Sequence, residues 1–135
     1  MEYCSSLMDM TWLVFAPNLK KIDIWYCDNM EEIISVKKWG EVSEKMGNLN
    51  LFAEVEFLCL VGLSNLKSIY WNPLPFRKLK TVNVIGCPKL KKLPLDSNSA
   101  KEHTIVIKGQ KNWWKRLEWE DQATENAFRN SYQKA

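Results

Sequence analysis

The sequence is poor in the residues that build metal sites and disulfide frameworks. It has one histidine, His103, and four cysteines among 135 residues, and no C-x-x-C pair occurs. Zinc sites usually need paired Cys or His ligands at short spacing, and none is present. No apolar run reaches the length of a membrane span, and the N-terminus has no signal-peptide pattern. These absences exclude a zinc-finger or transmembrane reading and favour a cytosolic or nuclear address.

Catalytic signatures are missing as well. The sequence contains no G-x-S-x-G, G-x-x-x-x-G-K or H-E-x-x-H motif. Glu31 and Glu32 form a carboxylate pair, but adjacent side chains point apart and no second pair is placed opposite them. We therefore predict that the chain is not an enzyme and needs no cofactor or metal.

The sequence also lacks a large excess of charge of one sign, because its net charge is only +3. Basic residues gather at 77–80 and 89–92, between apolar positions, without forming a continuous stripe. Nucleic-acid binding usually requires a continuous basic stripe, so we do not expect this chain to bind nucleic acid. A solvated outer face explains these lysines, and a contact with an acidic partner domain is the alternative.

What the sequence does have is an apolar spacing that recurs three times. The offsets are 0, 3, 5, 8, 11 and 14, and they start at Leu19, Val55 and Leu79. The residues are Leu19, Ile22, Ile24, Cys27, Met30 and Ile33; Val55, Leu58, Leu60, Leu63, Leu66 and Ile69; and Leu79, Val82, Val84, Cys87, Leu90 and Leu93. This spacing is typical of leucine-rich repeats, in which each unit adds a short strand and a turn to a stack.

The predicted fold class is therefore α/β, a leucine-rich-repeat solenoid with one curved parallel sheet, an irregular or short helical convex side and a C-terminal cap. We expect about four to five repeats over residues 1–111 and a cap and tail over 112–135. The first repeat is longer than the others, and the excess falls in an insertion at 35–50, either a loop or a short helix. Strands should centre on Ile22–Ile24, Leu58–Leu60, Val82–Val84 and Ile105–Ile107.

Two further groups of residues can be placed by the repeat. Cys4, Cys27 and Cys87 share offset 8, which turns inward, whereas Cys59 should face outward; all four are expected to be free thiols. Trp113, Trp114 and Trp119 lie in the expected cap and should shield the open end of the core, with help from Phe128.

The candidate binding residues flank the inward positions of each strand, on the concave side of the sheet. They are Lys21, Asp23, Trp25, Tyr26, Cys59, Val61, Asn83, Ile85, Val106 and Lys108. Such a set has an apolar middle and a polar edge, as protein interfaces do. We choose Trp25 as the anchor, although packing of Trp25 against the Val61 side of the sheet is an equal alternative. The insertion at 35–50 is the second candidate surface.

Several strings resemble one protein family beyond the generic repeat. They are Thr11–Leu19, Met30–Ile34, Leu66–Phe76 with WNPLPF, Cys87–Pro94 with CPKLKKLP, and Trp119–Phe128. Together they resemble the C-terminal repeat region of plant coiled-coil, nucleotide-binding, leucine-rich-repeat (NB-LRR) disease-resistance proteins. The sequence contains neither the coiled coil nor the phosphate loop of that family, so we do not expect this chain to bind ATP.

The resemblance implies a protein-binding function in plant defence. Its implied partners are a pathogen effector or a guarded host protein, together with the nucleotide-binding module that the repeats restrain in the parent receptor. The implied address is cytoplasmic, with peripheral plasma-membrane association through the parent receptor. A leucine-rich-repeat substrate adaptor for ubiquitin ligation, or another protein-binding scaffold, is the alternative, and an F-box-like helical module would distinguish it.

Overall fold

The structure is a computed structural model that describes residue 9 and residues 18–35, 52–70, 76–97, 99 and 104–134. The expected insertion at 35–50 lies outside these residues except for Ser35. Cys4 and the string Thr11–Leu19 also lie outside them, apart from the last two residues of that string.

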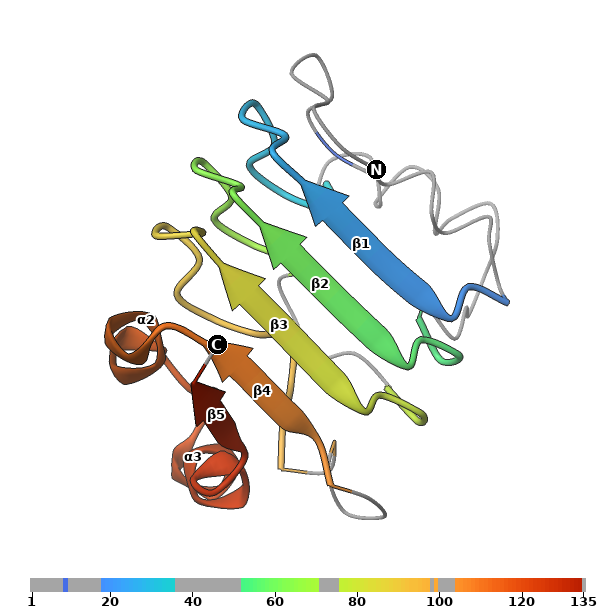
Figure 1. The fold of residues 1–135 in the computed structure, drawn as a ribbon. Helices are drawn as coiled ribbons and strands as arrows, with labels where there is room; N and C mark the ends of the chain where they lie inside the picture. The colour runs from blue at the N-terminus through green and yellow to red at the C-terminus, as the bar shows by residue number, and fades with distance from the viewer. Residues whose placement is uncertain are drawn as a thin grey trace.

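Five strands form one parallel sheet in the order of the sequence (Figure 1). They are β1 (Lys21–Trp25), β2 (Phe57–Val61), β3 (Thr81–Ile85), β4 (Val106–Gly109) and β5 (Tyr132–Lys134). Each strand pairs in parallel with the next one along the chain. The parallel pairing of the four predicted strands is therefore confirmed, and β5 is an addition that the sequence analysis did not predict.

The alternation of buried and exposed residues explains why these segments form strands. In β1, Ile22 and Ile24 are buried while their neighbours on either side are half-buried or exposed. Ile22 lies opposite Leu58, which lies opposite Val82, and the second inward position repeats this alignment. Side chains two apart share one face of a strand, so apolar offsets 3 and 5 become one buried face.

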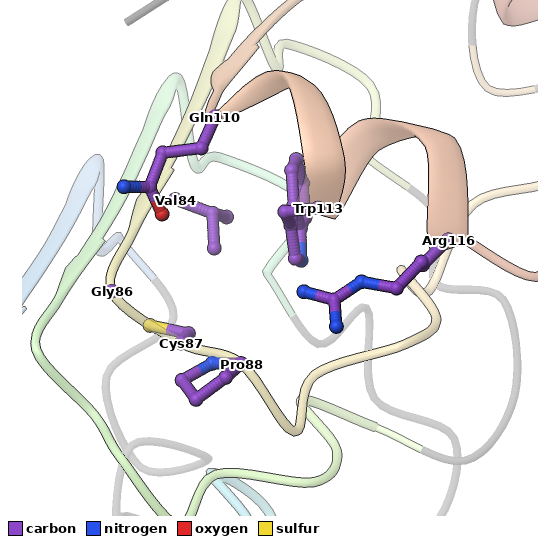
Figure 2. A pocket seen from close by; sticks show the side chains of 7 residues that line it. All are labelled: Val84, Gly86, Cys87, Pro88, Gln110, Trp113 and Arg116. Carbon is purple, nitrogen blue, oxygen red and sulfur yellow. The ribbon is translucent and has the colours of Figure 1, made fainter.

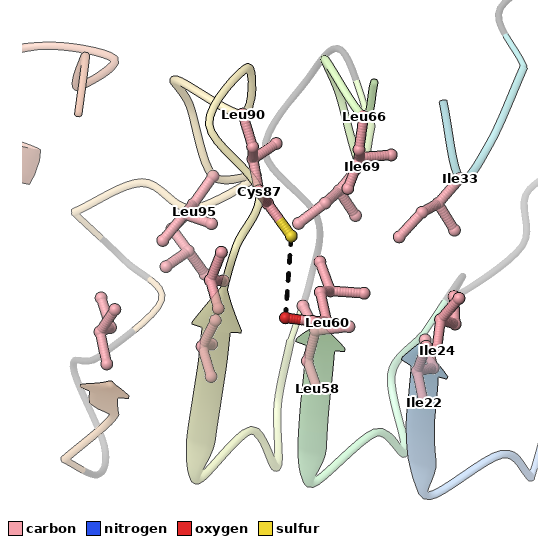
Figure 3. Close-up of a cluster of buried hydrophobic side chains, with 14 of the residues drawn as sticks. Ile22, Ile24, Ile33, Leu58, Leu60, Leu66, Ile69, Cys87, Leu90 and Leu95 are labelled. Atoms are coloured by element: carbon pink, nitrogen blue, oxygen red, sulfur yellow. Dashed lines mark hydrogen bonds between the residues drawn. The ribbon is translucent and has the colours of Figure 1, made fainter. Parts of the chain in front are cut away.

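The later offsets of each repeat return the chain beneath that face. Cys27, Met30 and Ile33 are completely buried. A turn closes at the same place in three repeats, where the amides of Met30, Leu66 and Leu90 each donate to the carbonyl three residues earlier, at 3.2 Å. Inward side chains of successive repeats pack into one apolar core (Figure 3). Residues at the same sequence offset therefore occupy equivalent positions in successive repeats.

The last repeat departs from the predicted alignment. The predicted strand centre at Ile105–Ile107 would align Ile105 with Val82 and Ile107 with Val84, whereas the structure pairs Val82 with Ile107 and Val84 with Gly109. The strand therefore begins at Val106, and its register with β3 is shifted by two residues from the predicted one. Side chains alternate with a period of two, so Val106 and Lys108 keep their predicted face despite the shift.

A glycine and a tryptophan explain this shift. Gly109 is buried at an inward position, and a Cβ there would lie 2.5 Å from Cε3 of Trp113. The Trp113 ring thus fills the space that a side chain at the inward position would take. Its indole Nε1 also donates to the Leu90 carbonyl at 2.9 Å.

Two helices and β5 follow at the C-terminal end of the sheet (Figure 1). They are α2 (Lys111–Arg116) and α3 (Gln122–Phe128), and the Asp121 carboxylate caps α3 by accepting from the Thr124 amide at 2.8 Å. Trp113 and Phe128 are buried there, and Trp119 stacks on Phe128 with ring centroids 5.6 Å apart. Within the described residues, no helix is both long and apolar enough to cross a membrane.

Candidate functional site

One face of the sheet carries all ten candidate residues. Nine of them lie on strands at positions that alternate with the core, and Tyr26 directly follows β1. We call this the exposed sheet face and define it as Lys21, Asp23, Trp25, Tyr26, Phe57, Cys59, Val61, Thr81, Asn83, Ile85, Val106 and Lys108. Each of its residues is exposed or half-buried. Their role in binding stays a prediction.

The in-register strands align this face into three rows. The first runs Lys21, Phe57, Thr81, Val106; the second runs Asp23, Cys59, Asn83, Lys108; and the third runs Trp25, Val61, Ile85. The third row is entirely apolar and lies at the carboxyl ends of the strands, whereas the second is polar. A partner on this face would therefore meet an apolar strip beside a polar one.

Two members of the first row were not among the predicted residues. Phe57 is 42% exposed, one of two large apolar side chains that are this open among the described residues. It precedes Leu58 as Lys21 precedes Ile22, and Thr81 holds the same place in the third repeat. The repeat offset alone would have found both.

An aromatic pair stands at the start of the apolar row. The Trp25 indole donates to the Asp23 carboxylate, which fixes the ring. Tyr26 meets Trp25 edge to face, with ring centroids 6.3 Å apart and planes at 82°. Tyr26 is 43% exposed, so the fold leaves much of this pair to solvent.

Tyr26 also has an unusual backbone. Its φ is +56°, and the equivalent residues of the next two repeats, Gly62 and Gly86, have φ of +66°. A side chain in this left-handed region costs roughly 1–2 kcal/mol, which glycine avoids. The Tyr26 ring covers Gly62, since a Cβ on Gly62 would lie 2.5 Å from Tyr26 Cδ1. The first repeat thus keeps an aromatic residue where the others have glycine.

The polar row holds a buried acceptor. Asn83 Nδ2 donates to Cys59 Sγ at 3.7 Å, and Asn83 Oδ1 is buried without a hydrogen-bond partner among the described residues. Burial raises the pKa of the Cys59 thiol, and the nearby Asp23 carboxylate raises it further. This thiol is therefore protonated at neutral pH and is a poor nucleophile.

The basic residues before β3 are joined to neighbouring repeats. Lys80 pairs with Glu56 at 2.9 Å, and Lys78 pairs with Glu54 at 2.7 Å. The hydrogen bond and charge of Lys80 lower the pKa of the Glu56 carboxyl. These lysines bridge successive repeats, so they are not a separate basic patch.

The thiols of the described residues are separate from one another and from the acidic groups. Cys27, Cys59 and Cys87 form no disulfide among the described residues, and Cys27 and Cys87 are buried as predicted. Cys87 Sγ donates to the Leu60 carbonyl at 3.7 Å (Figure 3), and burial raises its pKa to about 11. Within the described ranges, no three His, Cys, Asp or Glu side chains are placed to hold a metal ion.

A small cavity opens at the carboxyl ends of β3 and β4, between the turn after β3 and helix α2 (Figure 2). Its volume is about 170 Å³, and it is lined by Val84, Gly86, Cys87, Pro88, Gln110, Trp113 and Arg116. Arg116 extends across its opening toward Pro88 (Figure 2).

Comparison with known proteins decides what this repeat sheet belongs to. The family described as "Plant disease resistance protein RPS2-like, leucine-rich repeats" matches residues 1–101. The chain belongs to this family. The match, together with the relatives below, identifies it with the C-terminal leucine-rich-repeat region of a plant NB-LRR resistance protein.

Curated relatives from Arabidopsis thaliana agree with this assignment. Disease resistance protein RFL1 is 49% identical over 94% of this chain, and disease resistance proteins RPS5 and SUMM2 are each 42% identical over 93% of it. The chain spans 14% of the length of each of these relatives. No solved structure matches the chain. The leucine-rich repeats of such resistance proteins form a protein-interaction module that is generally non-enzymatic.

Proposed function

We propose that this chain is a non-enzymatic protein-interaction domain of a plant intracellular immune receptor. Its repeats stack as a solenoid, and the exposed sheet face is the concave, partner-binding side. The domain contributes to recognition of a pathogen effector or guarded host protein, and it restrains the nucleotide-binding module of the parent receptor. The receptor is cytoplasmic, and it carries the domain to the inner side of the plasma membrane.

The observation that carries this proposal is the composition of the exposed sheet face. An apolar row ending in the fixed Trp25–Tyr26 pair lies beside a polar row with an unsatisfied acceptor, Asn83 Oδ1. Rigid aromatic side chains are common binding hot spots, because little conformational entropy is lost when they are covered. The exposed aromatic pair and the apolar row favour a protein partner over a small ligand.

The test is a binding measurement with the nucleotide-binding module of a full-length receptor of this family as the partner. A pull-down from plant extract supplies effector-side or host partners for the same measurement. Trp25→Ala should weaken binding by about 30-fold, which corresponds to a hot spot of about 2 kcal/mol. Gln122→Ala, at an exposed position on α3, is the control and should bind like the wild type.

Thermal melts show whether each variant is folded. Unchanged affinity of a folded Trp25→Ala variant for a verified partner would rule out the exposed sheet face as the binding side. The insertion at 35–50 would then become the better candidate.

A further inference from the structure

Among the described residues that line the cavity beside Gly86, one is charged and the others are apolar or neutral. Pro88 and Trp113 supply apolar surface, Gln110 supplies an amide, and none of these described residues is acidic. The Cys87 thiol donates inward to backbone carbonyls, and burial raises its pKa to about 11, so it adds no charge at neutral pH. The Arg116 guanidinium is therefore the only formal charge among the described lining residues.

Arg116 has donors to spare. Its Nε donates to the Asn112 carbonyl at 3.2 Å, and among the described residues no carboxylate lies within ion-pair distance of it. A guanidinium presents five N–H groups in a planar fork that matches a carboxylate. Lys111 and Lys115 on the same helix add positive charge. Charge complementarity thus points to an anionic occupant.

The size of the cavity limits that occupant further. Pockets for drug-sized ligands measure roughly 300 Å³ or more, whereas this one holds about 170 Å³. That volume suits one amino-acid side chain. It lies at the carboxyl ends of β3 and β4, directly after Ile85 of the apolar row, so a partner on the exposed sheet face can reach it by extending over this edge of the sheet.

We infer that this cavity binds a glutamate or aspartate side chain of the protein partner, with the carboxylate on Arg116 and the methylene groups against Pro88 and Trp113. The inference rests on the proposed function and adds a chemical requirement to it. A partner needs an acidic residue placed to reach α2 while its apolar residues cover Trp25, Val61 and Ile85. The Gln110 amide can hydrogen-bond the backbone beside that acidic residue.

The experiment uses the whole chain and two blocked dipeptides as probes, N-acetyl-leucyl-glutamate amide and its glutamine counterpart. Binding is followed in ¹H–¹⁵N spectra through the Trp113 indole and Arg116 Nε signals. The glutamate probe should shift both signals saturably, with a Kd in the millimolar range, and should bind about tenfold more tightly than the glutamine probe.

Variants assign the discrimination to Arg116. Arg116→Gln should abolish the preference for the glutamate probe over the glutamine probe. Arg116→Lys should retain part of this preference, because the charge stays while the planar guanidinium is lost. Arg129→Gln, an exposed arginine at the end of α3, should retain the full preference. Arg116 is exposed, so these variants should fold, and their melts verify it.

Equal binding of the two probes, no saturable shift, or a preference that survives in Arg116→Gln would each overturn the inference. If the probes fail while Trp25→Ala still weakens partner binding, only the acidic-side-chain site is wrong. If the probes discriminate while Trp25→Ala has no effect, the exposed sheet face is wrong and the cavity stands.

Discussion

At the scale of single residues, Gly109 sets the geometry of the last repeat. A Cβ at this position would lie 2.5 Å from the Trp113 ring and 3.1 Å from the Val84 carbonyl oxygen. We expect Gly109→Ala to lower the free energy of unfolding by about 1–3 kcal/mol, the usual cost of overpacking. Urea denaturation followed by tryptophan fluorescence measures this change.

Two further variants test whether the contact with Trp113 causes that loss of stability. Lys108→Ala changes the neighbouring position on the exposed sheet face and should alter stability by roughly 0.5 kcal/mol or less. In a Trp113→Leu background the ring is gone, so adding Gly109→Ala should cost much less than it does alone. Additive losses would show that the ring contact does not explain the glycine.

A second residue-scale prediction concerns Cys87 and alkaline pH. Burial raises its pKa from the ordinary 9.0 to about 11, because the charged thiolate is disfavoured in the core. The unfolded chain therefore loses this proton first as the pH rises. The contribution of Cys87 is fully present below about pH 9 and is lost between about pH 9 and 11, on the order of 2–3 kcal/mol in all.

The comparison that checks this is the pH dependence of unfolding in the wild type and in Cys87→Ala. Lysine deprotonation affects both proteins alike, so the difference between the two curves isolates the thiol. We expect the wild type to lose stability more steeply above pH 9. Parallel curves would contradict the assignment of Cys87 as a buried, protonated thiol.

At the scale of elements, the sequence predicts the first three strands because the rule that sets them is local. Apolar residues at offsets 3 and 5 point to one side of a strand, and β1, β2 and β3 pair at those residues. The register of the fourth strand depends on a side-chain contact that the apolar spacing does not reveal. Ile105 and Ile107 have the same spacing as the earlier pairs, but the fit of Gly109 against Trp113 moves the register by two residues.

The fifth strand could not be predicted for a related reason. Tyr132–Lys134 is mostly polar and shows no alternation, and it pairs with a single neighbour, β4. Tyr132 is held by stacking on Trp114, with ring centroids 5.0 Å apart, and by its hydroxyl donating to the Gly109 carbonyl at 2.9 Å. These are tertiary contacts between segments that are distant in the sequence.

The candidate site was partly predictable on the same grounds. The period of two placed ten residues on one face, including two in the shifted repeat, because a two-residue shift conserves the face. What could not be read was the fixed Trp25–Tyr26 geometry, the buried Asn83 acceptor and the cavity at Arg116. The Asn83 acceptor and the cavity depend on residues from different repeats or from the C-terminal helices, and the Trp25–Tyr26 geometry depends on the positive φ of Tyr26.

At the scale of the whole molecule, one core joins the repeats to helices α2 and α3. The buried apolar cluster runs from Ile22 in the first repeat to Phe128 in α3 without separating into parts. In stacked repeats each unit relies on its neighbours for burial, so damage to a central unit removes support on both sides. Leu60 is completely buried in the second repeat, at the middle of this cluster.

We therefore predict that Leu60→Asp unfolds the described sheet and cap together. An unpaired buried charge costs several kcal/mol, comparable to the whole stability of a small domain, which is about 5–15 kcal/mol. Lys91→Asp is the control, because Lys91 is exposed and a surface change should cost roughly under 1 kcal/mol. Thermal melts should show one transition for the wild type and Lys91→Asp, and no cooperative transition for Leu60→Asp. A cap that keeps its own melt in Leu60→Asp, seen through the shielded Trp113 indole signal, would mean that the cluster is energetically divided even though it is continuous in space.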